Sequence, residues 1–158
     1  MLFGAGSQAQ DRAFVEPSAD LKWLRTLRVT VTQTTPDAAS CGLKVGSYIK
    51  TLEDSFSAGG LGIETTPSTL AVLSVMTKLN QESQLCGSAV MLGIYRLISF
   101  FDETTGSLEQ GYVVLWQQGQ QVFSPGLAHP EMTNTAIVQL AEKVIADWMA
   151  ANGRTETE

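Results

Sequence analysis

Residues 86–101 read Cys86-Gly-Ser-Ala-Val-Met-Leu-Gly-Ile-Tyr-Arg-Leu-Ile-Ser-Phe-Phe101, a long apolar stretch interrupted by one charged side chain. A polar turn follows at 102–106 and closes on Gly106, and residues 112–116 (Tyr-Val-Val-Leu-Trp) form an apolar return. A polar turn that closes on glycine between two apolar runs is typical of a β-hairpin. We therefore predict a long hairpin, with a further short piece of strand at 122–123.

Three more strands and two helices are expected around this hairpin. Leu27, Val29 and Val31 alternate with polar residues, which predicts a strand over 22–33. Apolar residues at steps of three and four predict a helix over 38–57 that ends at the two glycines 59 and 60. A short strand is expected at 61–66. Residues 69–81 fit a helix or a strand, and their β-branched content favours the strand.

A last helix is predicted near the C-terminus. Thr133 or Asn134 caps it, an apolar stripe runs from Ile137 to Trp148, and Asn152-Gly153 ends it. The order is β-α-β-β-β-β-α, which indicates an α+β fold with a mostly antiparallel sheet of 4–5 strands and two helices on one face. Residues 21–152 are expected to form one domain, between a flexible arm or signal-peptide remnant at 1–20 and a disordered tail at 153–158.

The second face of the predicted sheet is the candidate functional surface. An antiparallel sheet that is covered on one side usually has a polar second face, yet both sides of 89–101 are largely apolar. Residues 1–20 or 121–132, another subunit or a small ligand could cover it. The expected contact residues are Met91, Tyr95, Leu97, Tyr112 and Trp116, since aromatic side chains dominate interface energies. The glutamine-rich segment 117–121 is a recognition strand with a bulge at Gly119 or a solvated edge strand.

Composition and motifs argue against several classes of function. Lys plus Arg is 10 and Asp plus Glu is 16, which opposes binding to a phosphate backbone. No apolar run of 18 residues exists, so no membrane span is predicted. The single histidine, His129, is interpreted as a loop residue before the last helix, and Asp102-Glu103 as turn residues. No nucleophile, phosphate-loop or metal motif is present, so we expect no enzyme, no metal and no cofactor.

Two features favour an exported protein. Ser7 and Ala9 fit the −3 and −1 positions of a signal-peptidase site, although an ordinary flexible arm has the same composition. Cys41 and Cys86 are the only cysteines and lie outside any C-x-x-C pair. They are two buried thiols or, as the export signs favour, a disulfide. The expected location is periplasmic or secreted.

The order of the elements and the general character of their residues also resemble a family of small bacterial envelope proteins. The segments LRVTVTQTT, FSAGGLGIETTP, LAVLSVMTKL and GYVVLWQQG resemble the α/β domain of the curli secretion lipoprotein and the amino-terminal domain of the Tol translocation protein. The resemblance would cover residues 22–150 and rests on no diagnostic motif. It implies a role in assembly, secretion or envelope integrity through protein contacts and carries no catalytic residues. The chain has no lipobox cysteine near its start.

The sequence therefore predicts a non-enzymatic exported domain that contacts another protein or forms a homo-oligomer, such as a dimer. The alternative is a small protein that binds an apolar ligand on the same face, in a pocket lined by Met91, Tyr95 and Trp116. We expect no nucleic-acid partner.

Overall fold

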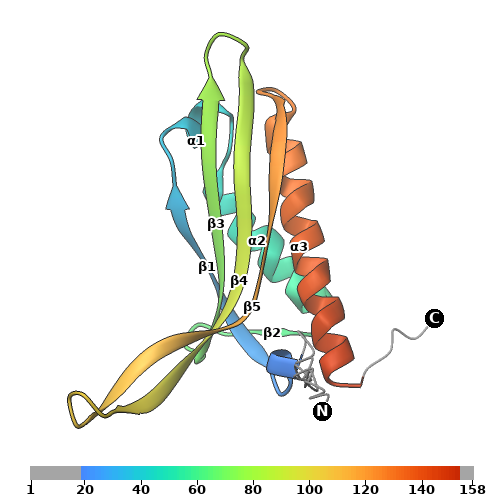
Figure 1. Cartoon of the computed structure of the whole chain (residues 1–158). Helices are drawn as coiled ribbons and strands as arrows, with labels where there is room; N and C mark the ends of the chain where they lie inside the picture. Colours follow the sequence, from blue (N-terminus) through green and yellow to red (C-terminus); the bar gives the residue numbers. More distant parts are fainter. Residues whose placement is uncertain (1–18, 154–158) are drawn as a thin grey trace, which may run out of the picture.

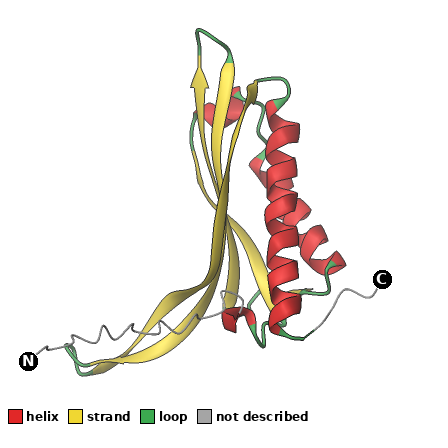
Figure 2. Ribbon diagram, turned by 45° about the vertical axis from the view of Figure 1, so that its right-hand side comes forward, coloured by secondary structure: helices red, strands yellow, loops and turns green. Residues whose placement is uncertain are grey.

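The fold is a single β-sheet with all of its helices on one side (Figures 1 and 2). The computed structural model describes residues 19–153, so the predicted N-terminal arm up to residue 18 and the tail from 154 lie outside it. The elements, in chain order, are η1 (Ala19–Leu21), β1 (Thr26–Thr34), α1 (Asp37–Ser40), α2 (Val45–Ala58), β2 (Gly62–Ile63), β3 (Thr69–Asn80), β4 (Leu85–Asp102), β5 (Ser107–Pro125) and α3 (His129–Ala151).

The strands lie in the order β2-β1-β3-β4-β5. The long strands β3, β4 and β5 pair antiparallel, whereas β1 is parallel to both of its neighbours. The chain makes this parallel connection by crossing over through α1, α2 and β2, as a parallel pair requires. The α+β prediction and its element order are confirmed.

The core lies between the sheet and the two long helices. Every second residue of β3 from Thr69 to Thr77 and of β4 from Cys86 to Ile94 points at the helices and is buried, while α2 and α3 bury stripes at helical spacing. The largest fully buried side chains of this layer include Leu52, Phe56, Leu73, Leu92, Ile94, Ile137 and Leu140. Burying each such side chain contributes about 1.5–3 kcal/mol, so this layer supports the whole sheet.

The predicted helix over 38–57 is two helices. The helix is interrupted after α1, at Cys41. Gly42 follows with a φ of +74°, in the left-handed region, which ends the helix there. The break turns Cys41 and Leu43 into the core, where both are buried. A continuous helix would not have brought Cys41 to β4.

Cys41 and Cys86 form a disulfide with a Cα–Cα distance of 6.0 Å, which confirms the predicted pair. The bond joins the end of α1 to the start of β4 across 45 residues of chain. On the chain-entropy account, closing a loop of that length stabilises the fold by about 4 kcal/mol.

Other element bounds differ from the prediction. The first strand begins at Thr26 instead of residue 22. Leu21 is buried at the end of a 3-10 turn, Trp23 has a φ of +73°, and Leu24 is buried after it. The short strand predicted at 61–66 covers Gly62–Ile63 only. The helix α3 begins at His129, four residues before the predicted cap.

Candidate interaction surface: the arm and the open face

A two-stranded arm projects from the sheet. The pairing between β3 and β4 ends at Thr69 opposite Arg96, but the pairing between β4 and β5 continues to Asp102 opposite Ser107. Residues 97–112, here called the arm, therefore form a ribbon with no third strand, and Figures 1 and 2 show it reaching beyond the helices. A two-stranded hairpin alone is marginally stable in water.

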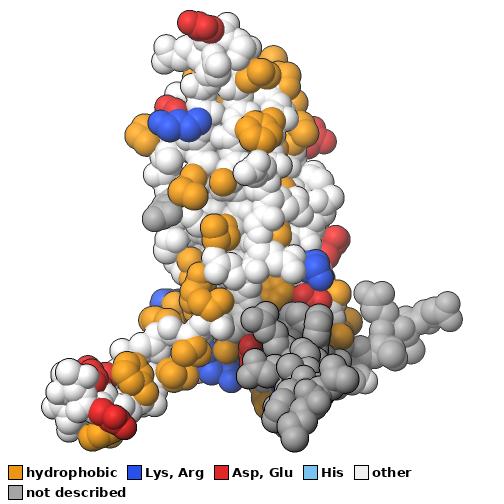
Figure 3. Space-filling model, viewed as in Figure 1, with side chains coloured by type: hydrophobic (Ala, Val, Ile, Leu, Met, Phe, Trp, Pro, Cys, Tyr) orange, Lys and Arg blue, Asp and Glu red, His pale blue; other side chains and the backbone are white. Residues whose placement is uncertain are grey.

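The arm exposes large apolar side chains. Leu108 is 77% exposed, Phe101 61% and Tyr112 54%, and Phe100 is also exposed. Single exposed apolar residues are ordinary, but a contiguous group on a projecting element is typical of an interaction site. Figure 3 shows hydrophobic side chains gathered on the ribbon at the lower left.

A β-bulge decides which residues share the outer surface. Ile94 lies opposite Trp116 and Tyr95 opposite Val114, so Leu115 has no partner on β4. One extra residue reverses the alternation of side chains along β5. Tyr112 and Val114 consequently lie on the side away from the helices, whereas Trp116 lies on the helix side.

The structure therefore brings together four of the five predicted contact residues. Met91, Tyr95 and Leu97 alternate along one face of β4, and Tyr112 lies opposite Leu97 on that face. Trp116 is separated from them: it is 5% exposed and its indole N–H donates to Asp147 Oδ2 of α3 at 2.8 Å. Its place in the predicted group is wrong, because the alternation assumed a strand without a bulge.

The side of the sheet away from α2 and α3, here called the open face, is uncovered by the described residues (Figure 3). Residues 121–132, one of the predicted covers, instead complete β5 and begin α3. The apolar side chains on the open face include Leu70, Val72, Met76, Met91, Tyr95 and Phe123. Gly87 and Gly93 leave room for neighbouring rings, since a Cβ at Gly93 would lie 2.5 Å from Tyr95 Cε2. The aromatic rings therefore lie flat on the sheet.

The glutamine-rich segment is part of the edge strand β5. Its residues pair with β4 in unbroken register, and Gly119 lies opposite Met91 without a bulge. Gln117 Nε2 approaches Met91 Sδ, while most of the other amide side chains are exposed. Of the two predicted roles, the solvated edge strand describes this segment, because the bulge is at Leu115.

Positive charge collects where the arm joins the sheet. Arg25 and Arg96 line a hollow of about 250 Å³ together with Trp23, Ser68 and Thr69. Arg28 on β1 lies opposite Leu70 of β3, on the other side of the sheet from Arg96. Among residues 19–153 no carboxylate lines this hollow, and none of the three arginines forms an ion pair.

Negative charge collects at the opposite end of the arm. Asp102, Glu103 and Glu109 lie at or next to the turn. Asp102 Oδ1 accepts the Thr104 N–H at 2.8 Å, and Glu109 accepts the Ser107 hydroxyl at 2.8 Å, which fixes the shape of the tip. Within the described part of the chain these acids have no cationic partner. This geometry agrees with the prediction that Asp102 and Glu103 are turn residues.

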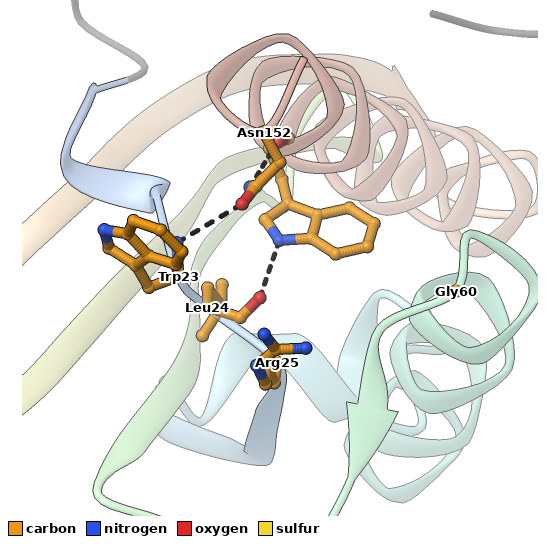
Figure 4. Close-up of a pocket in the computed structure, with 6 residues that line it drawn as sticks. Trp23, Leu24, Arg25, Gly60 and Asn152 are labelled. Carbon is orange, nitrogen blue, oxygen red and sulfur yellow. Dashed lines mark hydrogen bonds between the residues drawn. The ribbon is translucent and has the colours of Figure 1, made fainter. Parts of the chain in front are cut away.

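A second hollow, of about 240 Å³, shares Trp23, Leu24 and Arg25 with the first and is also lined by Gly60, Trp148 and Asn152 (Figure 4). The Trp148 indole N–H donates to the Leu24 carbonyl at 2.8 Å, and the Trp23 N–H donates to Asn152 Oδ1 at 3.3 Å. These bonds attach the segment before β1 to the end of α3. Sequence reasoning missed the arrangement because it placed Trp23 in a strand; no periodicity signals a single left-handed residue.

His129 is a buried core residue instead of a loop residue. Its Nδ1 lies 2.7 Å from Ser124 Oγ and its Nε2 lies 2.7 Å from Ser88 Oγ, which in turn bonds Thr77 Oγ1 at 2.7 Å. The ring is fully buried, and this burial lowers the pKa of His129. The buried imidazole therefore hydrogen-bonds two buried serine hydroxyls directly and is linked through Ser88 to the hydroxyl of Thr77.

No group of three potential metal ligands occurs among residues 19–153. In the same range, no helix combines the length and the apolar character needed to cross a membrane.

No protein-family model and no curated protein sequence matches the chain. Two solved structures of PelC from Paraburkholderia phytofirmans, both dodecamers and one a substituted form, are similar to it in fold. They have a TM-score of 0.41 and identities of 14% and 12%, and the match covers 79% and 78% of this chain and 86% and 87% of theirs. A candidate lipoprotein from Caulobacter crescentus CB15 has a TM-score of 0.35 at 12% identity, covering 85% and 91%. These likenesses concern the fold at a coarse level and carry no argument about function.

Proposed function

We propose that this chain is a non-enzymatic, exported domain that acts by protein contact, with the arm and the open face as its contact surface. The observation that carries the proposal is the arm itself. A two-stranded ribbon with exposed Phe101, Leu108 and Tyr112 is unfavourable in isolation, because it leaves apolar area in water and adds nothing to the core. Contact with another protein would remove that area from water.

The disulfide supports the exported location. The bond between Cys41 and Cys86 uses both cysteines of the chain. Structural disulfides form and persist in oxidising compartments, and the periplasm of bacteria is one of them. The Ser7 and Ala9 pattern agrees with export and lies outside the described residues.

The buried state of the only imidazole supports a non-enzymatic role. His129 has no exposed surface, and both of its ring nitrogens are hydrogen-bonded to serines inside the core. The alternative of an apolar ligand pocket required Met91, Tyr95 and Trp116 to line one cavity. Trp116 lies on the helix side of the sheet, so these three residues form no common pocket.

Photo-crosslinking in living cells tests the proposal. A photoreactive amino acid replaces Leu108 on the arm or, as a matched exposed control, Ala146 on the outside of α3. We expect irradiation to give covalent adducts of higher mass from position 108 and none from position 146. The proposal is contradicted if position 108 gives no adduct, or if both positions give the same adducts.

A further inference from the structure

The first turns of α2 and α3 border a hollow of about 390 Å³. This hollow is separate from the open face, because both helices lie on the other side of the sheet (Figure 2). Its lining comes from the turn before α2 and from the first turns of the two helices: Gly42, Lys44, Ser47, Tyr48, Pro130, Glu131 and Asn134.

The two helices run in the same direction. Thr51, in the first half of α2, donates its hydroxyl to Asn134 Oδ1 near the start of α3 at 3.2 Å, and Gly59, just after α2, lies against Ile145 near the end of α3. Parallel helices bring their positive dipole ends together, and the first N–H groups of each helix have no carbonyl partner within it. No side chain caps either helix. The hollow therefore lies in a positive field that favours an anion.

Tyr48 forms the floor of the hollow. Its side chain is 3% exposed, and its hydroxyl bonds to no atom of residues 19–153. Helix side chains lean towards the N-terminus of their helix, so Tyr48 leans from the first turn of α2 back towards the end that borders the hollow. Burial raises the pKa of Tyr48, so its hydroxyl stays protonated and can donate. Buried hydroxyls nearly always have a partner, so this donor points to an acceptor on a ligand.

Two further donors line the same hollow. Lys44 is exposed and forms no ion pair within the described part of the chain. Asn134 accepts from Thr51 through Oδ1, which leaves its Nδ2 to donate elsewhere. Glu131 is the one acidic side chain in the lining, and Lys44 balances its charge. Both charged side chains are exposed at the rim, where such chains rotate within nanoseconds and admit a ligand to the floor.

We propose that this hollow binds an oxyanion, a carboxylate or a phosphate group, held by Lys44, Tyr48 and Asn134. Oxygens of these groups accept the N–H and O–H bonds that the three side chains offer. A cation is disfavoured, because Lys44 and both helix dipoles repel it. The volume of about 390 Å³ lies within the range of small-molecule pockets, about 300–1,000 Å³, so the hollow also admits the group that carries the oxyanion. This site is independent of the arm and of the proposed protein contact.

Thermal unfolding of the purified chain tests the site with inorganic phosphate and with acetate, each against chloride at the same ionic strength. We expect at least one of the two ions to raise the unfolding midpoint above its value in chloride and to saturate, because a ligand that binds only the folded state stabilises it. An effect of phosphate alone identifies a phosphate group as the ligand, and an effect of acetate alone identifies a carboxylate.

Variants place the bound ion, with dissociation constants measured by amide chemical-shift titration. Tyr48→Phe and Lys44→Gln should each weaken binding about tenfold, since each removes one hydrogen bond to a charged group. Lys50→Gln, on the exposed side of the same helix, should leave it unchanged. Glu131→Gln should tighten binding about threefold by removing a like charge. In chloride, Tyr48→Phe should be at least as stable as the native chain, because it removes a buried hydroxyl without a partner.

Three results would overturn the inference. One is that neither ion raises the unfolding midpoint above the chloride value. Another is that Lys50→Gln weakens binding as much as Lys44→Gln, which would show a general effect of surface charge. The third is a Tyr48→Phe variant that binds as tightly as the native chain but unfolds more easily in chloride, which would show that water satisfies the hydroxyl of Tyr48.

Discussion

Trp116 lies opposite Ile94 across β4 and β5, while its near neighbour Val114 lies opposite Tyr95. The extra residue between them, Leu115, reverses which side of the ribbon each residue of β5 faces. On the arm side of the bulge the even-numbered residues of β5 therefore continue the open face, and beyond it the odd-numbered residues do. The bulge therefore allows one strand to bury Trp116 in the core and to expose Tyr112 and Val114 on the outer surface.

The bulge predicts opposite phenotypes for two aromatic residues four positions apart. Trp116→Ala removes a buried indole and its bond to Asp147, and should lower the free energy of unfolding by about 3 kcal/mol or more. Tyr112→Ala should change it by less than about 0.5 kcal/mol, yet weaken association. Urea unfolding and sedimentation separate the two effects. A Tyr112→Ala variant as unstable as Trp116→Ala would show that the arm belongs to the core.

The open face predicts a matched pair of glycine substitutions. A Cβ at Gly93 would lie 2.5 Å from the Tyr95 ring, so Gly93→Ala should displace the ring and destabilise the fold by about 1–3 kcal/mol. Gly46 in α2 has nothing within 4 Å, so Gly46→Ala should stabilise the fold by about 0.5 kcal/mol. Thermal unfolding measures both. Equal shifts from the two variants would disprove the packing of Tyr95 over Gly93.

The disulfide predicts a redox-dependent stability. Reduction should lower the free energy of unfolding by about 4 kcal/mol, because the reduced unfolded chain regains the entropy of the open loop. The comparison is urea unfolding with and without reductant. The double variant Cys41→Ala with Cys86→Ala controls for the reductant itself and should not respond to it. An oxidised chain no more stable than the reduced one would remove the structural role of the bond.

The buried imidazole predicts a loss of stability in mild acid. Burial lowers the pKa of His129 below its unfolded value of about 6.5, so below that pH the unfolded state binds more protons than the folded one. The stabilisation is complete above about pH 6.5 and is lost as the pH falls below it. His129→Gln should be less stable at neutral pH but flat between pH 6.5 and 5.5. A native chain that is equally flat in this window would contradict the burial of a neutral ring.

The regular parts of the fold could be predicted because their side chains repeat. Alternation predicted β1 and β-branched content predicted β3, each to within a few residues, and the long apolar stretch from Cys86 predicted β4. The helix stripes were found for the same reason. The pairing of Cys41 with Cys86 was inferred from the signs of export, which do not depend on any repeat in the sequence.

Single residues that break a repeat could not be found in this way. Gly42 divides one predicted helix into two, Trp23 ends a predicted strand, and Leu115 moves Trp116 to the core. Each is a local change of backbone that depends on tertiary packing, and a pattern averaged over several residues does not contain it. The arm was missed for a different reason: its apolar residues look like core until the third strand is known to end at Thr69.

Size-exclusion chromatography of gently prepared cell extracts, for the native chain and for a variant in which residues 98–111 are replaced by Asn-Gly, is the most direct test of the proposed protein contact. Such a two-residue turn closes a hairpin without the arm. The account predicts that the native chain elutes in an assembly larger than its own mass of 17.0 kDa, while the shortened chain elutes at its own monomer mass. A native chain that elutes as a monomer in such extracts, or a shortened chain that stays in the same assembly, would contradict it.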